Sequence, residues 1–344
     1  MTLVACIGGG QLGRMLGLAG LPLGLRFRFL DPAADACAGA VGELVVGDYG
    51  DDDALARLAD GADVVTYEFE NVPVEAATRV LAVPGVAALE QGQDRLREKE
   101  LFRSLGIRTA RFGTLVETGV PALVKSRRLG YDGKGQRRVE AEEELAVGEL
   151  AEEIVAFQRE LSIIGVRGGH GETRFWPVAE NLHRDGILRV SRAPATSAPQ
   201  REAEAICGAL LDALDYIGVL AVELFEVDGG LLANEFAPRV HNTGHWTIDG
   251  AETSQFENHL RAILGLPLGS TEARAPCVMV NLIGTVPALD ELVALPGARV
   301  HLYGKEPRPG RNVGHMTLVD PDDETVTRAL ALSESEPGSE PARV

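Results

Sequence analysis

The sequence predicts an α/β protein of two or three domains, which opens with a Rossmann-like βαβ unit and ends in a smaller β-rich domain. With 344 residues, the chain exceeds the size at which a single hydrophobic core keeps growing. Strands and helices alternate in the first part of the chain, whereas short strands follow one another from Cys277 onward. We therefore expect domains at 1–93, 94–270 and 271–332, and a disordered tail rich in Ser, Glu and Pro at 333–344.

The composition is typical of a soluble globular protein, with 45% hydrophobic and 24% charged residues. The net charge of −18 argues against a nucleic-acid or anionic-membrane partner, because such partners require a basic protein surface. An anionic small molecule needs only a local basic pocket and is not excluded. The chain has no apolar run of membrane-spanning length, no recognisable signal peptide after Met1 and no cysteine spacing typical of metal sites, so we expect a cytoplasmic protein with reduced thiols.

A glycine-rich turn, Gly8–Gly13, separates the first expected strand, 2–7, from an expected helix at 14–21. A second strand, 26–30, leads to Asp31, so the turn fits the Gly-x-Gly-x-x-Gly dinucleotide fingerprint with an acid about 20 residues later. Taken alone, this fingerprint favours an NAD-dependent dehydrogenase. The same geometry binds any phosphate at a helix N-terminus, and a tight turn without a ligand also explains it.

Two acids accompany the third strong strand signal. We expect a helix at 51–59, a strand at 63–71 and a helix at 73–83. Along a strand with a period of two, Glu68 and Glu70 share one face near the carboxyl end, which is where open α/β sheets bind ligands. These acids suit a substrate with hydroxyl or amine groups, and a solvated strand end is the alternative.

The segment at 126–136 combines glycines with lysine and arginine side chains. It follows a charged helix at 94–105, which resembles a solvated face, and strands at 112–116 and 121–125. It is not a Walker loop, because neither Ser nor Thr follows its Gly-Lys pair. A mobile basic flap that closes over a triphosphate fits this composition, and a plain surface hairpin is the alternative.

Beyond this flap, strands alternate with helices. We expect an acidic helix at 141–150, an edge segment at 152–155, strands at 160–166 and 172–177, a loop at 179–186, helices at 200–216 and 253–264, and strands at 278–283, 298–302 and 316–319. A loop at 303–312 carries Lys305, Arg308 and Arg311. Three clustered cations in so acidic a chain indicate a grip for a monoester phosphate.

A hairpin brings two glutamates together. We expect strands at 218–227 and 231–236, and the three-residue turn Asp228–Gly230 would pair Glu223 with Glu235 across the hairpin. A two-residue turn would shift this register by one residue. Opposed carboxylates repel each other, so either both are solvated or they hold a divalent cation such as Mg²⁺, which takes one or two carboxylates plus substrate phosphates. The second interpretation predicts a phosphoryl-transfer site.

The order of these parts resembles the ATP-grasp superfamily and, within it, the N5-carboxyaminoimidazole ribonucleotide synthases of purine biosynthesis. The resembling motifs are Gly8–Met15, Thr66–Val72, Gly130–Gln136, Glu160–Ser162, Glu180–His183, Asn234–Trp246 and Tyr303–Gly310. The resemblance implies an ATP-grasp fold behind an N-terminal Rossmann-like domain, with a lid subdomain at about 112–165 and a small C-terminal β-rich domain.

The resemblance also implies an ATP-dependent carboxylation. In this family, bicarbonate attacks the γ-phosphate of ATP to give carboxyphosphate, which releases CO₂ inside a closed site. The amine of 5-aminoimidazole ribonucleotide captures the CO₂, so that N5-carboxyaminoimidazole ribonucleotide, ADP and phosphate are the products. Mg²⁺ is implied as a cofactor, biotin is not needed, and relatives are typically homodimers.

Roles for single residues follow from the same resemblance. ATP contacts are implied for Arg95, Lys125, Gly130, Tyr131, Asp132, Gly133, Lys134, Gly135, Gln136, Glu152, Glu153, Ile154, Val155, Glu160, His183, Asn234 and Glu235, and metal ligation for Glu223 and Glu235. Ribonucleotide contacts are implied for Gln11, Leu12, Tyr131, Lys305, Arg308, Arg311 and one of Glu68 or Glu70. Arg239, His241 and Asn242 would grip bicarbonate and CO₂, and Asp132 is the expected base for the amine proton.

Three alternatives predict other activities. A formate-using glycinamide ribonucleotide transformylase, which is another ATP-grasp enzyme, tends to have Pro-His-Asp where this chain has Val240–Asn242, and lacks the Gly244–Trp246 ending. An NAD-dependent dehydrogenase would leave the basic flap and the acid pair without a role. A non-catalytic nucleotide sensor could dispense with the Arg239, His241 and Asn242 set, all of which this chain carries.

Overall fold

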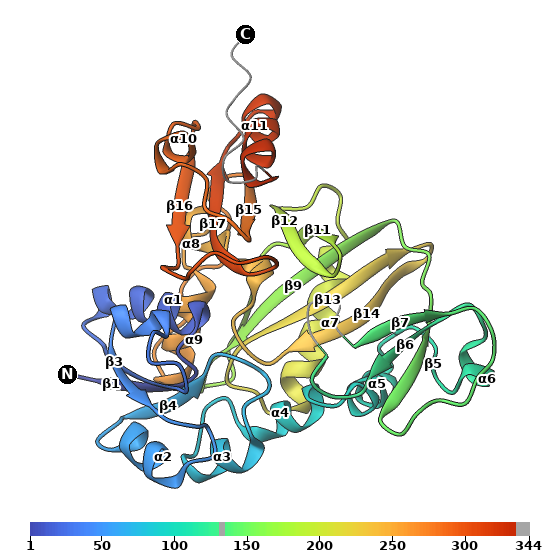
Figure 1. Ribbon diagram of the computed structural model, residues 1–344, viewed down its shortest axis with the longest axis horizontal. Helices are drawn as coiled ribbons and strands as arrows, with labels where there is room; N and C mark the ends of the chain where they lie inside the picture. Colours follow the sequence, from blue (N-terminus) through green and yellow to red (C-terminus); the bar gives the residue numbers. More distant parts are fainter. Residues whose placement is uncertain (131–134, 335–344) are drawn as a thin grey trace.

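The computed structural model describes residues 1–130 and 135–334, which form an N-terminal α/β unit, a small four-stranded unit and a long sheet that continues into the C-terminal part (Figure 1). The flap residues 131–134 and the expected disordered tail beyond residue 334 lie outside the described residues. Ser333 and Glu334, expected in that tail, instead end helix α11 (Asp323–Glu334). No helix in the described ranges is long and apolar enough to cross a membrane.

The N-terminal unit is a parallel sheet of order β3-β2-β1-β4 with helices packed around it. Its elements are β1 (Leu3–Ile7), α1 (Gln11–Gly20), η1 (Leu21–Leu23), β2 (Arg26–Asp31), η2 (Cys37–Ala40), β3 (Glu43–Val46), α2 (Asp52–Ala59), β4 (Val64–Tyr67), α3 (Val74–Arg79) and α4 (Val86–Gly92). The expected strand at 63–71 is too long, because β4 ends at Tyr67 and both acids lie beyond it. The expected helix at 73–83 is wrong beyond Arg79: Leu81 has a φ of 50°, and Pro84 cannot continue a helix.

The small unit is an antiparallel sheet of order β5-β8-β6-β7 that follows helix α5. Its elements are α5 (Arg95–Ser104), β5 (Phe112–Gly113), α6 (Leu115–Thr118), β6 (Ala122–Ser126), β7 (Gln136–Val139) and β8 (Glu149–Glu153). The expected strand at 112–116 stops at Gly113, because Thr114 and Glu117 form a capping box that begins α6.

The expected acidic helix at 141–150 is wrong. Residues 141–148 form an exposed, non-helical connection, and Gly148 has a φ of 87°, which ends any helix. A run of glutamates has high helix propensity but no apolar face to bury, so strand pairing of the following residues decides the structure. The expected edge segment at 152–155 is also wrong, because β8 lies between β5 and β6.

The long sheet is antiparallel and has the order β14-β13-β9-β11-β12-β15-β17-β16, with β10 paired to β9. Its strands are β9 (Arg159–Arg167), β10 (Thr173–Phe175), β11 (Ala179–Arg184), β12 (Ile187–Ala193), β13 (Gly218–Val227), β14 (Gly230–Ala237), β15 (Cys277–Ile283), β16 (Ala298–Leu302) and β17 (Asn312–Val319). The accompanying helices are α7 (Gln200–Ala213), η3 (Asn242–Gly244), α8 (Thr247–Gly250), α9 (Gln255–Ile263), α10 (Leu289–Val293) and α11.

The expected loop at 179–186 is largely strand β11. The usual alternation of apolar-in and polar-out is inverted there, since Leu182 is 55% exposed whereas Asn181 is buried. The hydroxyl of Ser191 donates to the side-chain oxygen of Asn181 at 2.7 Å, which satisfies this buried amide oxygen. A pattern based on hydrophobicity alone therefore did not predict this strand.

Glu223 and Glu235 are paired as expected, but the turn and the register that produce this pair differ from the expected ones. The turn has two residues, because Val227 pairs with Gly230, and this register alone would place Glu223 one residue out of step with Glu235. A β-bulge between Glu223 and Leu224 restores the pairing. The predicted pairing of Glu223 with Glu235 is therefore confirmed, whereas the predicted three-residue turn is wrong.

The N-terminal unit is tied to the long sheet by a buried histidine on α9. The Nε2 atom of His259 lies 3.0 Å from the hydroxyl of Thr66 on β4, and its Nδ1 atom accepts from the backbone amide of Val219 on β13 at 3.2 Å. Because Nδ1 accepts, Nε2 carries the proton and the ring is neutral. Burial lowers the pKa of His259 to about 4.

Candidate active site

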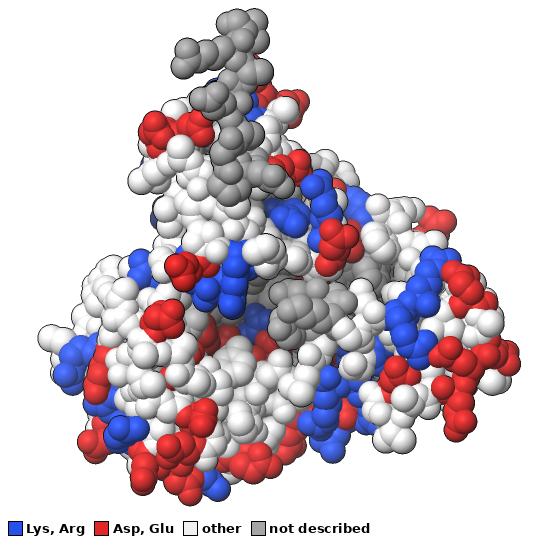
Figure 2. All heavy atoms as spheres, viewed as in Figure 1, with Lys and Arg blue, Asp and Glu red and all other residues white. Residues whose placement is uncertain are grey.

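A cleft of about 710 Å³ lies where the three units meet, which is within the range of ligand-binding pockets. Figure 2 shows the hollow between the units, with lysine and arginine side chains at its rim although the molecule as a whole is acidic. The predicted site residues that line the cleft are Gln11, Leu12, Glu68, Glu70, Arg95, Lys125, Gly130, Gln136, Glu160, His183, Glu223, Asn234, Glu235, Arg239, His241 and Asn242. Residues from distant parts of the sequence are thus brought to one place.

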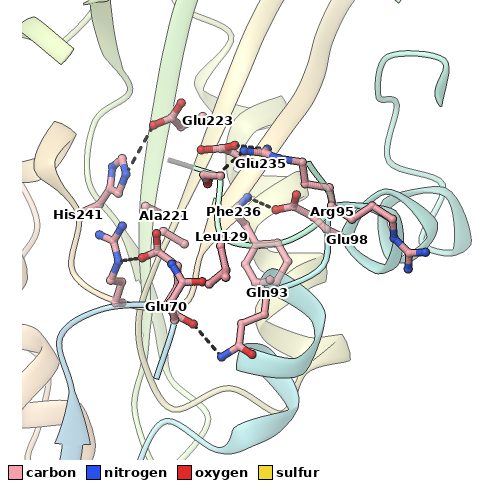
Figure 3. Close-up of a pocket in the computed structure, with 16 residues that line it drawn as sticks. Glu70, Gln93, Arg95, Glu98, Leu129, Ala221, Glu223, Glu235, Phe236 and His241 are labelled. Carbon is pink, nitrogen blue, oxygen red and sulfur yellow. Dashed lines mark hydrogen bonds and ion pairs between the residues drawn. The ribbon is translucent and has the colours of Figure 1, made fainter. Parts of the chain in front are cut away.

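The acid pair of the hairpin faces this cleft between two cationic or ionisable neighbours (Figure 3). Arg95 donates to Glu235 at 2.9 Å, and the Nε2 atom of His241 lies 3.5 Å from Glu223. Burial, followed by the negative charge of Glu235, raises the pKa of Glu223 to about 7. Two ionised carboxylates are therefore unfavourable here unless a further positive charge joins them.

A third carboxylate, Glu98 on α5, lies beside this pair and was not among the predicted site residues. Its side chain is buried and accepts from the backbone amide of Phe236 at 2.7 Å (Figure 3). Burial and the charge of Glu235 raise the pKa of Glu98 to about 8. The helix at 94–105 is therefore not a solvated face, and the position of Glu98 four residues before Phe102, on the buried side of α5, was the available signal.

A buried lysine, Lys99, shares a carboxylate partner with the cleft residue Lys125 and was also missed. Its ammonium group lies 3.3 Å from Glu152 and donates to the backbone carbonyl of Asn234 at 2.9 Å. Lys125 donates to the same carboxylate at 3.0 Å. Burial would raise the pKa of Glu152, but Lys99 and Lys125 outweigh it and lower that pKa to about 2. The predicted neighbour Glu153 points elsewhere and pairs with Arg111 at 2.7 Å.

An aromatic stack forms an apolar part of the cleft wall. Phe157 and Phe225 stack with ring centroids 4.7 Å apart, and both line the cleft. In the same cleft, Nδ1 of His183 lies 2.5 Å from Glu160. Burial opposes protonation of His183, but the hydrogen bond to Glu160 and the negative charges of Glu223, Glu160 and Glu235 together outweigh it and raise the pKa of the imidazole. The apolar wall suits a planar base packed against it, and the Glu160 carboxylate suits hydroxyl groups.

The predicted bicarbonate residues follow directly after β14. Arg239 is held by an ion pair with Glu70, so one of the two strand-end acids supports a cleft cation. Burial and the charge of Arg239 lower the pKa of His241 to about 3, so this imidazole is neutral at physiological pH. Its Nδ1 atom lies 2.9 Å from the hydroxyl of Thr243, which orients the ring. One guanidinium and a neutral ring suit a small anion.

Glu68 closes the glycine-rich turn from inside the protein. Its carboxylate accepts from the backbone amides of Gly10 and Gly13 at 2.5 and 2.6 Å, and Asp31 accepts from Gly9 at 2.9 Å. These are the amides that a pyrophosphate would need at the N-terminus of α1. The protein's own carboxylates therefore fill the place of a dinucleotide phosphate.

The basic loop at 303–312 lines the cleft through Gly310 and Asn312, and its lysine contacts a cleft residue. Lys305 donates to the side-chain oxygen of Gln11 across the gap between the C-terminal and N-terminal parts. Burial lowers the pKa of Lys305, and the opposite effect of Cys37 and Glu68 does not outweigh it. Arg308 is exposed, and Arg311 donates to the backbone carbonyl of Glu306 at 3.2 Å. Lys305 is thus positioned at the cleft more directly than either arginine.

The expected residues Tyr131, Asp132, Gly133 and Lys134 lie outside the described residues, and Ile154 and Val155 follow the end of β8. Within residues 1–130 and 135–334, no group of three or more His, Cys, Asp or Glu side chains is arranged to hold a metal ion. A metal at this site would therefore depend on Glu223, Glu235 and oxygen atoms from a ligand.

Comparison with protein families divides the chain into three matches. Residues 1–90 match the ribonucleotide synthetase preATP-grasp domain, residues 108–256 match the ATP-grasp domain, and residues 277–329 match the phosphoribosylaminoimidazole carboxylase C-terminal domain. The nine-stranded sheet spans the second and third matches without a break.

Known proteins are similar over almost the entire chain. N5-carboxyaminoimidazole ribonucleotide synthase from Pseudomonas aeruginosa is 49% identical, covering 96% of this chain and 98% of that protein. The crystal structure of N5-carboxyaminoimidazole ribonucleotide synthetase from Thermus thermophilus superimposes with a TM-score of 0.92 at 52% identity, covering 97% and 99% of the two chains. N5-carboxyaminoimidazole synthase from Aspergillus clavatus, in complex with ADP and 5-aminoimidazole ribonucleotide, gives a TM-score of 0.86 at 32% identity, covering 96% and 97%.

Proposed function

The chain belongs to the N5-carboxyaminoimidazole ribonucleotide synthases, and we propose that it carboxylates 5-aminoimidazole ribonucleotide with bicarbonate and ATP in purine biosynthesis. The observation that carries the proposal is the juxtaposition of two chemistries in one cleft. An acid pair suited to a metal–triphosphate complex lies beside an arginine and a neutral histidine suited to a small anion. Phosphoryl transfer to bicarbonate requires these two ends to be neighbours.

We place the base of ATP against the apolar wall that the stacked rings of Phe157 and Phe225 form, with its ribose hydroxyls toward Glu160. Lys125 would exchange its contact with Glu152 for the triphosphate, while Lys99 remains with Glu152 and prevents an unpaired buried carboxylate. The other nucleotide contacts implied by the resemblance, including Gly130–Gln136, Glu153–Val155 and His183, remain part of this proposal.

Mg²⁺ fits the acid pair. Burial and the negative charge of Glu235 raise the pKa of Glu223, and a hard dication between Glu223 and Glu235 would offset both effects. When bound, the metal would offset the negative charge of the transferring phosphoryl group. Arg95, which already contacts Glu235, would lie beside the same phosphates. Nothing in this arrangement calls for biotin.

At the anion end, Arg239, His241 and Asn242 would orient bicarbonate for attack on the γ-phosphorus. Glu70 holds the guanidinium in place, and the neutral imidazole of His241 presents a hydrogen-bond donor without a competing titration near pH 7. One bicarbonate oxygen forms a bond to phosphorus as the bond to ADP breaks, which gives carboxyphosphate. Cleavage of carboxyphosphate yields phosphate and CO₂, and the ribonucleotide amine attacks the carbon of CO₂ and loses a proton.

The ribonucleotide would occupy the cleft between Gln11, Leu12 and the basic loop, with Lys305, Arg308 and Arg311 toward its phosphate. Both oxygens of Glu68 accept from the backbone amides of the turn at Gly10 and Gly13. We therefore propose that this acid stabilises the glycine-rich turn in addition to any contact with the ligand. Asp132 remains the proposed base for the amine proton. We further propose a homodimer in the cytoplasm, where the four free cysteines would stay reduced.

Phosphate release from ATP tests the proposal. It should require bicarbonate and be stimulated by 5-aminoimidazole ribonucleotide. Release that instead depends on formate and glycinamide ribonucleotide would favour the transformylase, and release that needs neither carbon source would reject both. The dehydrogenase alternative is not supported, because Glu68 and Asp31 occupy the amides that its cofactor would need.

A further inference from the structure

Three side-chain amides, the middle one buried, form a chain from the anion end of the cleft to the start of β17. Asn281, which is 1% exposed, is the single strongly polar side chain in the strand Cys277–Ile283. Its Nδ2 group donates to Oδ1 of Asn242 at 3.1 Å and to the backbone carbonyl of Leu188 at 3.0 Å. Its Oδ1 atom accepts from Nδ2 of Asn312 at 3.0 Å. Strands β12, β15 and β17, which carry Leu188, Asn281 and Asn312, are neighbours in the long sheet (Figure 1).

Backbone groups at both ends determine which way these amides face. A carbonyl oxygen can only accept, so Leu188 requires the NH₂ group of Asn281 on its side. At the other end, the backbone amide of Gly314 donates to Oδ1 of Asn312 at 3.3 Å, which turns Nδ2 of Asn312 toward Asn281. Two independent backbone groups therefore demand the same orientation of Asn281.

The orientation of Asn242 follows from that of Asn281. Because Asn281 presents hydrogens, Asn242 meets it with its oxygen, and the Nδ2 group is the part of the Asn242 amide left for the cleft that this residue lines. Bicarbonate and carboxyphosphate are anions that need donors. A flipped Asn242 would offer them a carbonyl oxygen, which repels an anion and loses one hydrogen bond.

We propose that Asn281 is a positioning residue for the carboxylation, because it holds Asn242 with its donor toward bicarbonate. The inference rests on the proposed function only in taking Asn242 as a bicarbonate ligand. It also explains the presence of a buried amide in an otherwise apolar strand, since an amide is costly there unless its hydrogen bonds are made. Through Asn312, the chain also reaches the end of the basic loop at 303–312, so both substrate-binding ends share one rigid support.

The variant Asn281→Leu tests this role, because leucine has a similar volume and neither donates nor accepts. Freed from Asn281, Asn242 can flip, so the KM for bicarbonate should rise about tenfold or more, as expected for a lost hydrogen bond to a charged group. The KM for ATP should stay within about twofold. Asn258→Leu is the matched control: Asn258 is also fully buried, but it bonds to the backbone of Gly269 and neither residue lines the cleft, so the KM for bicarbonate should not change.

A double-mutant cycle separates positioning from general destabilisation. In an Asn242→Ala background, Asn281→Leu should change the KM for bicarbonate by less than about twofold, because the group that it positions is absent. Independent, multiplying effects would overturn the inference, and so would equal rises of the KM for ATP and for bicarbonate in the single variant. If the leucine variant does not fold, Asn281→Thr decides the question in the same way, since its one hydroxyl hydrogen satisfies Leu188 and leaves none for Asn242. A wild-type enzyme without bicarbonate-dependent product would refute the proposed function instead.

Discussion

Replacing Glu235 by glutamine should abolish turnover and, at neutral pH, make the ligand-free protein more stable. The pKa of Glu223 is about 7 instead of an ordinary 4.5, which costs about 3 kcal/mol at pH 7.5. Burial is the largest cause and the charge of Glu235 the second, so we assign about 1 kcal/mol to Glu235. Glu98, with a pKa of about 8, should recover a similar amount.

The loss of the Arg95–Glu235 ion pair opposes this gain. Glu235 is 40% exposed, so the pair contributes at most about 1 kcal/mol. The expected net gain is therefore about 1 kcal/mol at pH 7.5, which is a rise of about 1–2 °C in Tm for a chain of this length. Raised carboxyl pKa values destabilise the folded state only above the unfolded pKa, so the gain should vanish at pH 4.5.

Thermal unfolding at pH 7.5 and 4.5, with phosphate release at limiting Mg²⁺, measures both effects. Glu226→Gln is the matched control, because Glu226 also pairs with an arginine, Arg159 at 2.6 Å, on the same hairpin but away from the acid pair. The control should keep its activity and gain no stability at pH 7.5. An active Glu235→Gln enzyme, or an equal gain in stability at both pH values, would refute the reasoning.

Three further perturbations follow from individual contacts. Lys99→Met should destabilise the protein by about 3 kcal/mol or more, because it leaves Glu152 with one partner in a buried site. It should also raise the KM for ATP more than the KM for bicarbonate. Chemical denaturation and initial rates measure these two effects, and unchanged values would show that Lys99 is dispensable. The pKa of His259 in the folded protein is lowered to about 4, so its contribution to stability is complete above pH 6.5. As the pH falls toward 4, about 3 kcal/mol of this stability is lost. His259→Gln should flatten the pH dependence of Tm over that range, and an unchanged slope would contradict this. Asp132→Asn should retain bicarbonate-dependent ATP cleavage while the carboxylated product falls about 10²–10⁴-fold, measured in one reaction with the labile product trapped; equal losses would mean that Asp132 is not the base.

Much of the fold could be predicted from the sequence, because its signals were local. The glycine turn after an apolar strand, the helix that was expected at 200–216 and is observed as Gln200–Ala213, and the hairpin strands each carry a period or a turn residue that acts within a few positions. The predictions failed where tertiary contacts outweighed local pattern. The glutamates at 141–150 favour a helix locally, but the chain pairs Glu149–Glu153 with β6. Strand β11 buries Asn181 and exposes Leu182, which inverts the pattern used to find strands.

The site residues were predictable mainly through the motif resemblance. The residues that hold them in position were not predictable from the sequence. Glu223 and Glu235 meet only because a bulge compensates for a shorter turn, which no residue in the hairpin signals. Glu98, Lys99 and Asn281 act through partners more than 30 residues away in the sequence, and each looks like a surface residue or an isolated polar residue when only its neighbours are considered. Burial by distant segments gives these residues their function, so local sequence could not identify them.

The central claim is that an oxygen of bicarbonate attacks the γ-phosphorus of ATP in this cleft. Rapid mixing of the enzyme, Mg-ATP and 5-aminoimidazole ribonucleotide with ¹⁸O-labelled bicarbonate, quenched before the label exchanges with water, tests it directly. Because the new phosphorus–oxygen bond survives when carboxyphosphate breaks down, the released phosphate should contain one ¹⁸O atom from bicarbonate. Phosphate without label would contradict the account, since water or the ribonucleotide would then be the group that attacks phosphorus.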